Sequence, residues 1–234
     1  MPTSYQTAGF AVAPVFEPAE IEALRADVTD HIDRIAHALH LPFANSRPQA
    51  GFAERLEQVA RADASLANLL RVAICTDAHR GPRFQQIAED GRLLAKASEL
   101  AGVALGEPVI RLRANIPTLG RQRQGWHSDV ARPDGGACSR IRIACWVPLM
   151  DAGPDSGGLE IAVGRRATPL DHDGNSFEIP EEALARHPRH AADCPMGSVL
   201  FLDRYTPHRA LPNETDAARF ALVMWLKEKD SPPS

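Results

Sequence analysis

Apolar residues in the first hundred positions recur every three or four residues. This spacing covers three segments, from Pro18 to about Leu39, from about Gly51 to Cys75, and from roughly Arg83 to Leu105. Residues three and four apart lie on one face of a helix, so each segment is predicted to be an amphipathic helix. The region 1–106 is therefore expected to be mostly helical and to support the rest of the fold.

The pattern then changes to the alternation that is typical of strands. Five segments show it: Pro108–Ala114, Ile141–Leu149, Gly158–Val163, Ser198–Leu202 and Arg219–Leu226. Their joins are rich in Gly, Pro and Asp, with a short helix predicted from Pro180 to His187. Short strands with such joins indicate a mainly β fold with added α: a double-stranded β-helix (jelly roll, cupin-like barrel) over 107–228, flanked by N-terminal helices.

Length and composition narrow the class of protein. The chain has 234 residues and no separating linker, so one domain over 1–234 is expected. A formal net charge of −4 favours neither nucleic acid nor a membrane surface as a partner. No apolar run approaches the roughly 20 residues of a membrane span, and the first residues lack a signal-peptide pattern. The four cysteines show no CxxC spacing, so reduced thiols and a cytoplasmic protein are predicted.

Candidate metal ligands stand in the sequence His127-Ser128-Asp129 and at His208. Side chains two apart on an extended segment point to the same side, so His127 and Asp129 can bind the same metal ion. His208 could complete the 2-His-1-carboxylate arrangement of non-haem Fe(II) oxygenases. The alternative is that these are three unrelated polar residues, since such a tripeptide also arises by chance. Their positions after predicted strands, where a barrel mouth would lie, favour the metal site.

Arg219 is a candidate for binding a keto acid. It lies eleven residues after His208 and begins an otherwise apolar strand. A charge that enters a barrel interior is costly unless it is paired, so an inward Arg219 needs an anion such as a carboxylate. The alternative is that Arg219 ends the strand and points to solvent.

At these residues the chain resembles the phytanoyl-CoA dioxygenase family of Fe(II)/2-oxoglutarate-dependent oxygenases. The resemblance covers roughly Val109 to Leu226. Its parts are His127-Ser128-Asp129, Trp146-Val147-Pro148-Leu149, Asp155-Ser156-Gly157-Gly158-Leu159-Glu160, Gly197-Ser198-Val199-Leu200, His208 and Arg219. The resemblance implies that His127, Asp129 and His208 hold Fe(II) and are catalytic, and that Arg219 binds the distal carboxylate of 2-oxoglutarate.

The resemblance implies two further cosubstrate contacts, and a departure from the family pattern points to a third. Asn115 matches a position where relatives often place a polar contact, and Trp146 would lie beside the cosubstrate; a turn cap and a core residue are the alternatives. Many relatives carry a small hydroxyl residue two positions after the second ligand histidine, where this chain has Ala210. Cosubstrate binding would then depend more on Arg219, and Thr206 could contribute.

The predicted function is that of a dioxygenase using Fe(II), 2-oxoglutarate and dioxygen. It would hydroxylate or otherwise oxidise a small organic substrate, a natural-product intermediate or amino-acid-like compound, with release of succinate and CO₂. One alternative is a cupin-like isomerase or hydrolase using zinc or manganese, which would not need Arg219. Another is a non-catalytic small-molecule-binding barrel. The sequence makes no prediction of the oligomeric state.

The resemblance implies that substrate contacts come from the helical N-terminal region, here within 1–106, and from the long joins. Arginines in those joins could serve an anionic substrate. They are Arg121, Arg123, Arg132, Arg140, Arg165 and Arg166. If they converge, they would suit a carboxylate or phosphate group, and the alternative is a solvated surface.

Overall fold

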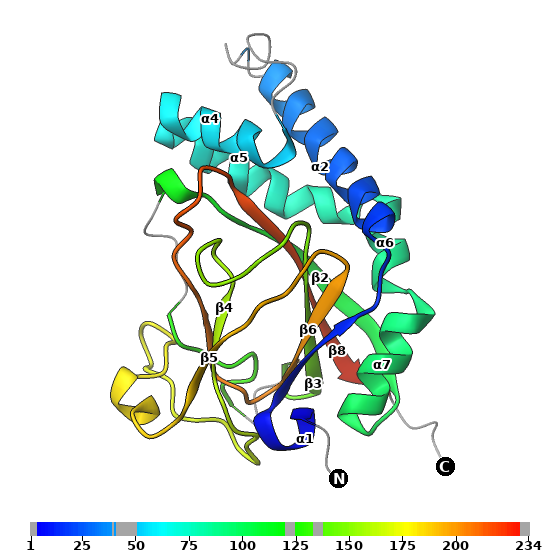
Figure 1. The fold of residues 1–234 in the computed structure, drawn as a ribbon, viewed down its shortest axis with the longest axis vertical. Helices are drawn as coiled ribbons and strands as arrows, with labels where there is room; N and C mark the ends of the chain where they lie inside the picture. The colour runs from blue at the N-terminus through cyan, green and yellow to red at the C-terminus, as the bar shows by residue number, and fades with distance from the viewer. Residues whose placement is uncertain (1–3, 39, 41–50, 120–124, 133–137, 230–234) are drawn as a thin grey trace.

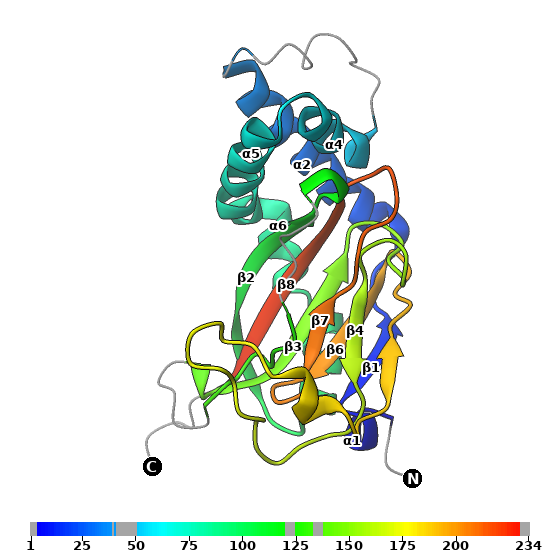
Figure 2. The ribbon, with the colours of Figure 1, turned by 90° about the vertical axis from the view of Figure 1, so that its left-hand side faces the viewer.

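Two antiparallel sheets form the centre of the computed structural model, which describes residues 4–38, 40, 51–119, 125–132 and 138–229 (Figures 1 and 2). The larger sheet has the order β1 (Phe10–Pro14), β6 (Ser198–Asp203), β3 (Ile141–Pro148), β8 (Arg219–Glu228) and β2 (Leu105–Asn115). The smaller has the order β5 (Arg189–Ala191), β4 (Leu159–Ala162) and β7 (His208–Ala210). This arrangement confirms the predicted jelly roll with added helices.

Helices pack on the outer face of the larger sheet. They are α1 (Ser4–Ala8), α2 (Pro18–Ala38), α4 (Phe52–Ala62), α5 (Ala64–Asp77), α6 (Pro82–Ala88) and α7 (Gly91–Ala101), and the 3₁₀ turns η1 (Ala78–Arg80) and η2 (Pro117–Leu119) lie among them. The 3₁₀ turn η4 (Glu181–Leu184) lies by the smaller sheet, where Leu184 packs with Ala162 of β4. Figure 2 shows α2, α4 and α5 gathered beyond the end of the sheet where β8 begins. Among the described helices, none combines the length and apolar character needed to cross a bilayer.

Alternation along β8 divides the core into two layers. Phe220, Leu222 and Met224 are buried against the helices, in one cluster with residues of α2, α5 and α7. Ala221 and Val223 face the other way, into the space between the two sheets. Because successive side chains of a strand point to opposite faces, a residue of β8 with an odd number lies on the inner face of the jelly roll.

Two of the predicted helices are each broken into two. The segment expected from about Gly51 to Cys75 breaks at Asp63, whose carboxylate accepts hydrogen bonds from the backbone N–H groups of Ser65 and Leu66 and so caps α5. The segment expected from Arg83 to Leu105 breaks before Asp90, which caps α7 in the same way. Both aspartates compete for backbone donors that a continuous helix would use, which apolar spacing alone does not reveal.

The ends of other predicted elements also differ. α7 ends at Gly102, which has a φ of +71°, and Leu105 already belongs to β2 rather than to the helix. The helix expected from Pro180 to His187 is only the 3₁₀ turn η4. Among the described α-helices and strands, four short ones were not predicted: α1, β1, β5 and β7. Each has five residues or fewer, too few to show a period.

Candidate metal centre

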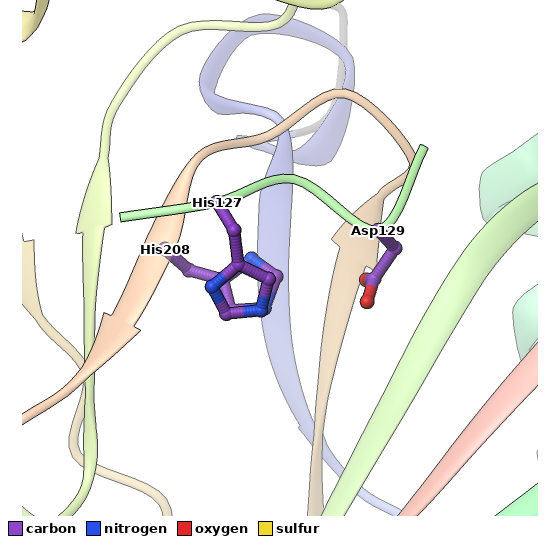
Figure 3. A group of neighbouring side chains, drawn as sticks. All are labelled: His127, Asp129 and His208. Atoms are coloured by element: carbon purple, nitrogen blue, oxygen red, sulfur yellow. The ribbon is translucent and has the colours of Figure 1, made fainter. Parts of the chain in front are cut away.

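His127 and His208 are brought together by backbone pairing between two distant segments. The backbone N–H of each donates to the carbonyl oxygen of the other, at 3.1 and 2.9 Å. Residues directly opposite on antiparallel strands project to the same side, and the two imidazole centroids are 4.4 Å apart (Figure 3). Asp129 follows two residues later on the same segment, and one ligand atom from each of the three residues lies within 4.8 Å of the others.

Hydrogen bonds to backbone carbonyls orient both imidazoles. Nδ1 of His127 is 2.9 Å from the carbonyl oxygen of Gly125, and Nδ1 of His208 is 3.0 Å from that of Thr206. A carbonyl oxygen only accepts, so each Nδ1 carries the hydrogen and each Nε2 keeps its lone pair. This is the arrangement by which proteins fix a metal-binding histidine.

The two carboxylate oxygens of Asp129 have different surroundings. Oδ1 accepts a hydrogen bond from the indole Nε1 of Trp225 at 2.6 Å. Oδ2 is buried and has no hydrogen-bond partner among the described residues. A buried carboxylate oxygen without a partner is costly, and a cation held by both imidazoles would supply one. The donor set therefore fits a divalent transition metal, including Fe(II).

Burial of His127 favours the neutral form of its imidazole. Desolvation, followed by the nearby His208, lowers the pKa of His127 to about 4. The imidazole is then neutral near neutral pH, and the neutral form is the one that binds a metal.

A cavity of about 240 Å³ lies between the sheets and includes all three groups. Besides the two histidines and Asp129, its polar and aromatic lining consists of Arg71, Arg113, Asn115, Trp146, Arg219 and Trp225. Three of the four predicted cosubstrate contacts are therefore in this cavity. Thr206 is not among the described lining residues: its hydroxyl donates to the carbonyl oxygen of Gly9 at 2.9 Å, and its own carbonyl orients His208.

Arg219 is buried at the first position of β8, and it faces the cavity rather than solvent. Its Nε donates to the carbonyl oxygen of Gly157 at 2.8 Å, and its guanidinium carbon lies 5.4 Å from the centre of the Trp146 ring. Burial lowers the pKa of Arg219 to about 10, which leaves it charged at neutral pH. A buried guanidinium without a carboxylate partner among the described residues is a site for an anionic ligand.

Asn115 lies opposite Arg219 in the β2–β8 pair. Its Nδ2 lies 3.3 Å from the carbonyl oxygen of Leu211, to which it donates. Gly157 fits closely against it: a Cβ at this position would come within 2.6 Å of Asn115 Nδ2, and the φ of Gly157 is +73°. The Gly157-Gly158 turn therefore allows the backbone to approach both Asn115 and Arg219.

Three polar or aromatic residues of the described cavity lining were not predicted: Trp225, Arg71 and Arg113. Trp225 could have been found, since it shares the inner face of β8 with Arg219. The two arginines depend on how α5 packs beside β2, which no local pattern encodes. Among the arginines expected in the joins, Arg121 and Arg123 lie outside the described residues. The other four do not line the described part of the cavity: Arg132, Arg140, Arg165 and Arg166.

Trp225→Phe is expected to weaken divalent-metal binding by about 10- to 100-fold, because Asp129 loses the bond that fixes its orientation. The measurement is a titration of the apo-protein with Mn(II), followed by electron paramagnetic resonance. Trp126→Phe is the matched control, since that indole lies against Arg189 and Arg209 rather than against Asp129. Equal losses in the two variants would contradict a positioning role for Trp225.

The turn that carries His208 is held by the N-terminal segment. The carbonyl oxygen of Gly9 accepts from the Asp203 N–H at 2.8 Å and from the Thr206 hydroxyl. Gly9 has a φ of +82°, and a Cβ there would come within 2.4 Å of Thr206 Oγ1. The unpredicted α1 and β1 therefore fix the approach to the second histidine.

Gly9→Ala is expected to lower the free energy of unfolding by about 1–3 kcal/mol, because alanine is strained at this φ and its methyl group displaces Thr206. The melting temperature should fall by several degrees in a thermal unfolding experiment. Gly174→Ala is the control, because it adds a methyl group in open space. A similar melting temperature for the two variants would contradict this account of the turn.

Fold and site together define the class: a jelly-roll protein whose cavity is lined by a 2-His-1-carboxylate candidate metal site. The sequence model of the phytanoyl-CoA dioxygenase (PhyH) family matches residues 5–221, most of the chain. The chain belongs to this family. A search of curated proteins found no match.

Solved structures share the fold. The non-haem α-ketoglutarate-dependent carbocyclase SnoK from nogalamycin biosynthesis has a TM-score of 0.64 and 16% identity, over 97% of this chain and 83% of SnoK. The epimerase SnoN, in complex with Fe³⁺, α-ketoglutarate and nogalamycin RO, has a TM-score of 0.61 and 20% identity, over 96% of this chain and 81% of SnoN. EctD from S. alaskensis, with 2-oxoglutarate and 5-hydroxyectoine, has a TM-score of 0.65 and 20% identity, over 96% of this chain and 74% of EctD.

Proposed function

We propose that this protein is an Fe(II)/2-oxoglutarate-dependent dioxygenase that oxidises a small organic molecule. One observation carries the proposal: two oriented imidazoles and an unsatisfied carboxylate oxygen converge in a cavity that also contains a buried arginine without a carboxylate partner. Membership of the PhyH family, and the α-ketoglutarate bound in SnoN, support this choice of metal and cosubstrate.

Each residue has a separate task. Nε2 of His127, Nε2 of His208 and Oδ2 of Asp129 would hold Fe(II) on one face and leave the opposite face open to the cavity. Arg219 would bind the distal carboxylate of 2-oxoglutarate and so fix its orientation, with the Trp146 ring beside it. Bound iron supplies the oxygen chemistry, in which the keto acid is converted to succinate and CO₂ as the substrate loses a hydrogen.

Hydroxylation of the substrate is the outcome that we propose. EctD is described with a hydroxylated product, whereas SnoK and SnoN are described as a carbocyclase and an epimerase. Proteins of this fold are thus described with different reactions, and we propose that the outcome depends on how the substrate lies. A zinc or manganese isomerase or hydrolase would leave Arg219 buried without an anion, which disfavours it. A cytoplasmic location stays a prediction.

The test is oxygen-dependent formation of succinate and CO₂ from 2-oxoglutarate by the purified protein with Fe(II), with and without a library of small organic compounds. We expect slow turnover without substrate, strong stimulation by the true substrate, and a hydroxylated product. Zn(II) replaces iron in the control and should give no succinate. Activity on a compound with Zn(II) and without 2-oxoglutarate would contradict the proposal.

A further inference from the structure

Three guanidinium groups line the cavity, and they come from three elements: Arg71 from α5, Arg113 from β2 and Arg219 from β8. The only carboxylate among the described lining residues is that of Asp129. No carboxylate of the described residues lies within 4.0 Å of any of the three guanidinium groups. What distinguishes these three arginines is that they line one cavity together.

Arg71 and Arg113 have hydrogen-bonding capacity to spare. Nε and Nη2 of Arg71 both donate to Oδ1 of Asn68, at 3.3 and 2.9 Å, which orients the guanidinium and leaves Nη1 for another acceptor. The guanidinium of Arg113, an exposed residue, has no hydrogen bond or ion pair with any described residue. Arginine donors in a cavity without an acceptor are typical of carboxylate and phosphate sites.

The positions of the two arginines differ from that of Arg219. The β2–β8 register places Arg113 opposite Ala221, which lies between Arg219 at the start of β8 and Trp225, the residue that bonds Asp129. β2 is the outermost strand of its sheet, and α5 packs beside it. Arg71 and Arg113 therefore flank the open edge of the cavity, where a second molecule would lie beside the cosubstrate.

The thiol of Cys75 lies near the same three guanidinium groups. Cys75 lies one helical turn after Arg71, on the same face of α5. Burial raises the pKa of the thiol, and the positive charges of Arg71, Arg113 and Arg219 all oppose that rise. The three guanidinium groups thus act on one point next to β2.

The formal charges of the loaded site leave an excess of positive charge. Asp129 and the two carboxylates of 2-oxoglutarate offset three positive charges, whereas the divalent metal and the three arginines supply five. Two positive charges remain, equivalent to Arg71 and Arg113. Clefts lined by charge of one sign concentrate ligands of the opposite sign.

We propose that Arg71 and Arg113 bind an anionic group of the organic substrate, a carboxylate or a tetrahedral oxoanion such as a phosphate or sulfate ester. This assignment rests on the proposed function, because it takes the metal and Arg219 to be occupied by iron and 2-oxoglutarate. It makes the substrate an organic acid or acid ester rather than a neutral compound.

The experiment uses the anaerobic complex of the protein with Fe(II) and 2-oxoglutarate, whose visible charge-transfer band reports an intact iron and cosubstrate site. Radiolabelled sulfate and radiolabelled propionate are the probes, and equilibrium dialysis measures their binding. We expect saturable binding of one probe molecule per chain, with the charge-transfer band retained. The probe that binds more tightly shows whether the site prefers a carboxylate or a tetrahedral oxoanion. Arg71→Met and Arg113→Met should each weaken binding about tenfold or more. Arg80→Met, at an exposed position outside this cavity, should leave it unchanged.

Two results overturn the inference while the proposed function stands. One is a normal charge-transfer band without binding of either probe, or with equal binding in Arg71→Met, Arg113→Met and the wild type. The other is loss of the band as the probe binds, which would assign the two arginines to the cosubstrate. Absence of the band in the wild-type protein alone would instead contradict the proposed function.

Discussion

Asp129→Ala is expected to abolish iron-dependent turnover and to weaken binding of Fe(II) or Mn(II) by more than a hundredfold. Loss of a residue that merely orients a ligand costs about 10- to 100-fold in metal affinity, so loss of a direct, charged ligand should cost more. Two imidazoles would remain, without the carboxylate that offsets part of the charge of the metal. Isothermal titration of the apo-protein with Mn(II), and succinate formation with Fe(II), are the two measurements.

The fold of the Asp129→Ala variant should survive. The substitution removes a buried oxygen without a partner and leaves only the Trp225 indole N–H unsatisfied, a cost of about 1–3 kcal/mol. Circular dichroism should show an unchanged spectrum. Asp171→Ala, at an exposed position, is the control and should bind metal as the wild type does. Full activity of Asp129→Ala would mean that the ligand set is wrong.

Arg219→Met is expected to raise the concentration of 2-oxoglutarate needed for half-maximal rate by roughly 30-fold to several thousandfold. Truncation of one partner of a buried, hydrogen-bonded charge pair costs about 2–5 kcal/mol, and about 1.4 kcal/mol corresponds to tenfold. The rate at saturating cosubstrate should change much less, because Arg219 is not a metal ligand. Steady-state kinetics with varied 2-oxoglutarate separate the two effects.

A truncated cosubstrate sharpens the Arg219 test. 2-Oxobutyrate keeps the keto acid end and lacks the distal carboxylate, so the wild type should strongly prefer 2-oxoglutarate, whereas Arg219→Met should use both about equally. Arg186→Met, at an exposed position outside the cavity, should keep the wild-type preference. An unchanged preference in Arg219→Met would exclude Arg219 as the carboxylate site.

The candidate site was predictable where local pattern and chemistry coincide. His127 and Asp129 lie two apart on an extended segment, and Arg219 is a charge at the start of an apolar strand. Both features can be recognised from residues close together in the sequence. The side-by-side placement of His127 and His208 was a hypothesis from motif order, and the structure brings these rings to 4.4 Å through a pair of backbone hydrogen bonds.

Long-range packing accounts for what the sequence did not reveal. Thr206 was expected at the cosubstrate, yet its hydroxyl bonds Gly9, about two hundred residues earlier in the chain. Gly9 belongs to a connection between α1 and β1, elements of five residues each that carry no periodic signal. Arg71 reaches the cavity because α5 packs beside the edge strand β2, and helix packing of this kind depends on the whole core.

The predicted helices failed where side chains compete with the backbone. Asp63 and Asp90 both interrupt apolar spacing that continues through them, and both cap the helix that follows. Aspartate at such positions is a known start signal. These two aspartates predict that each segment divides into two helices, whereas the apolar period alone predicts one continuous helix in each.

The most direct test of the metal site is a crystal grown without oxygen in the presence of Fe(II) and 2-oxoglutarate, with anomalous diffraction recorded at the iron absorption edge. We predict one strong peak within bonding distance of Nε2 of His127, Nε2 of His208 and Oδ2 of Asp129, with the distal carboxylate of the keto acid on Arg219. A peak elsewhere, or iron bound without Asp129, would contradict the account.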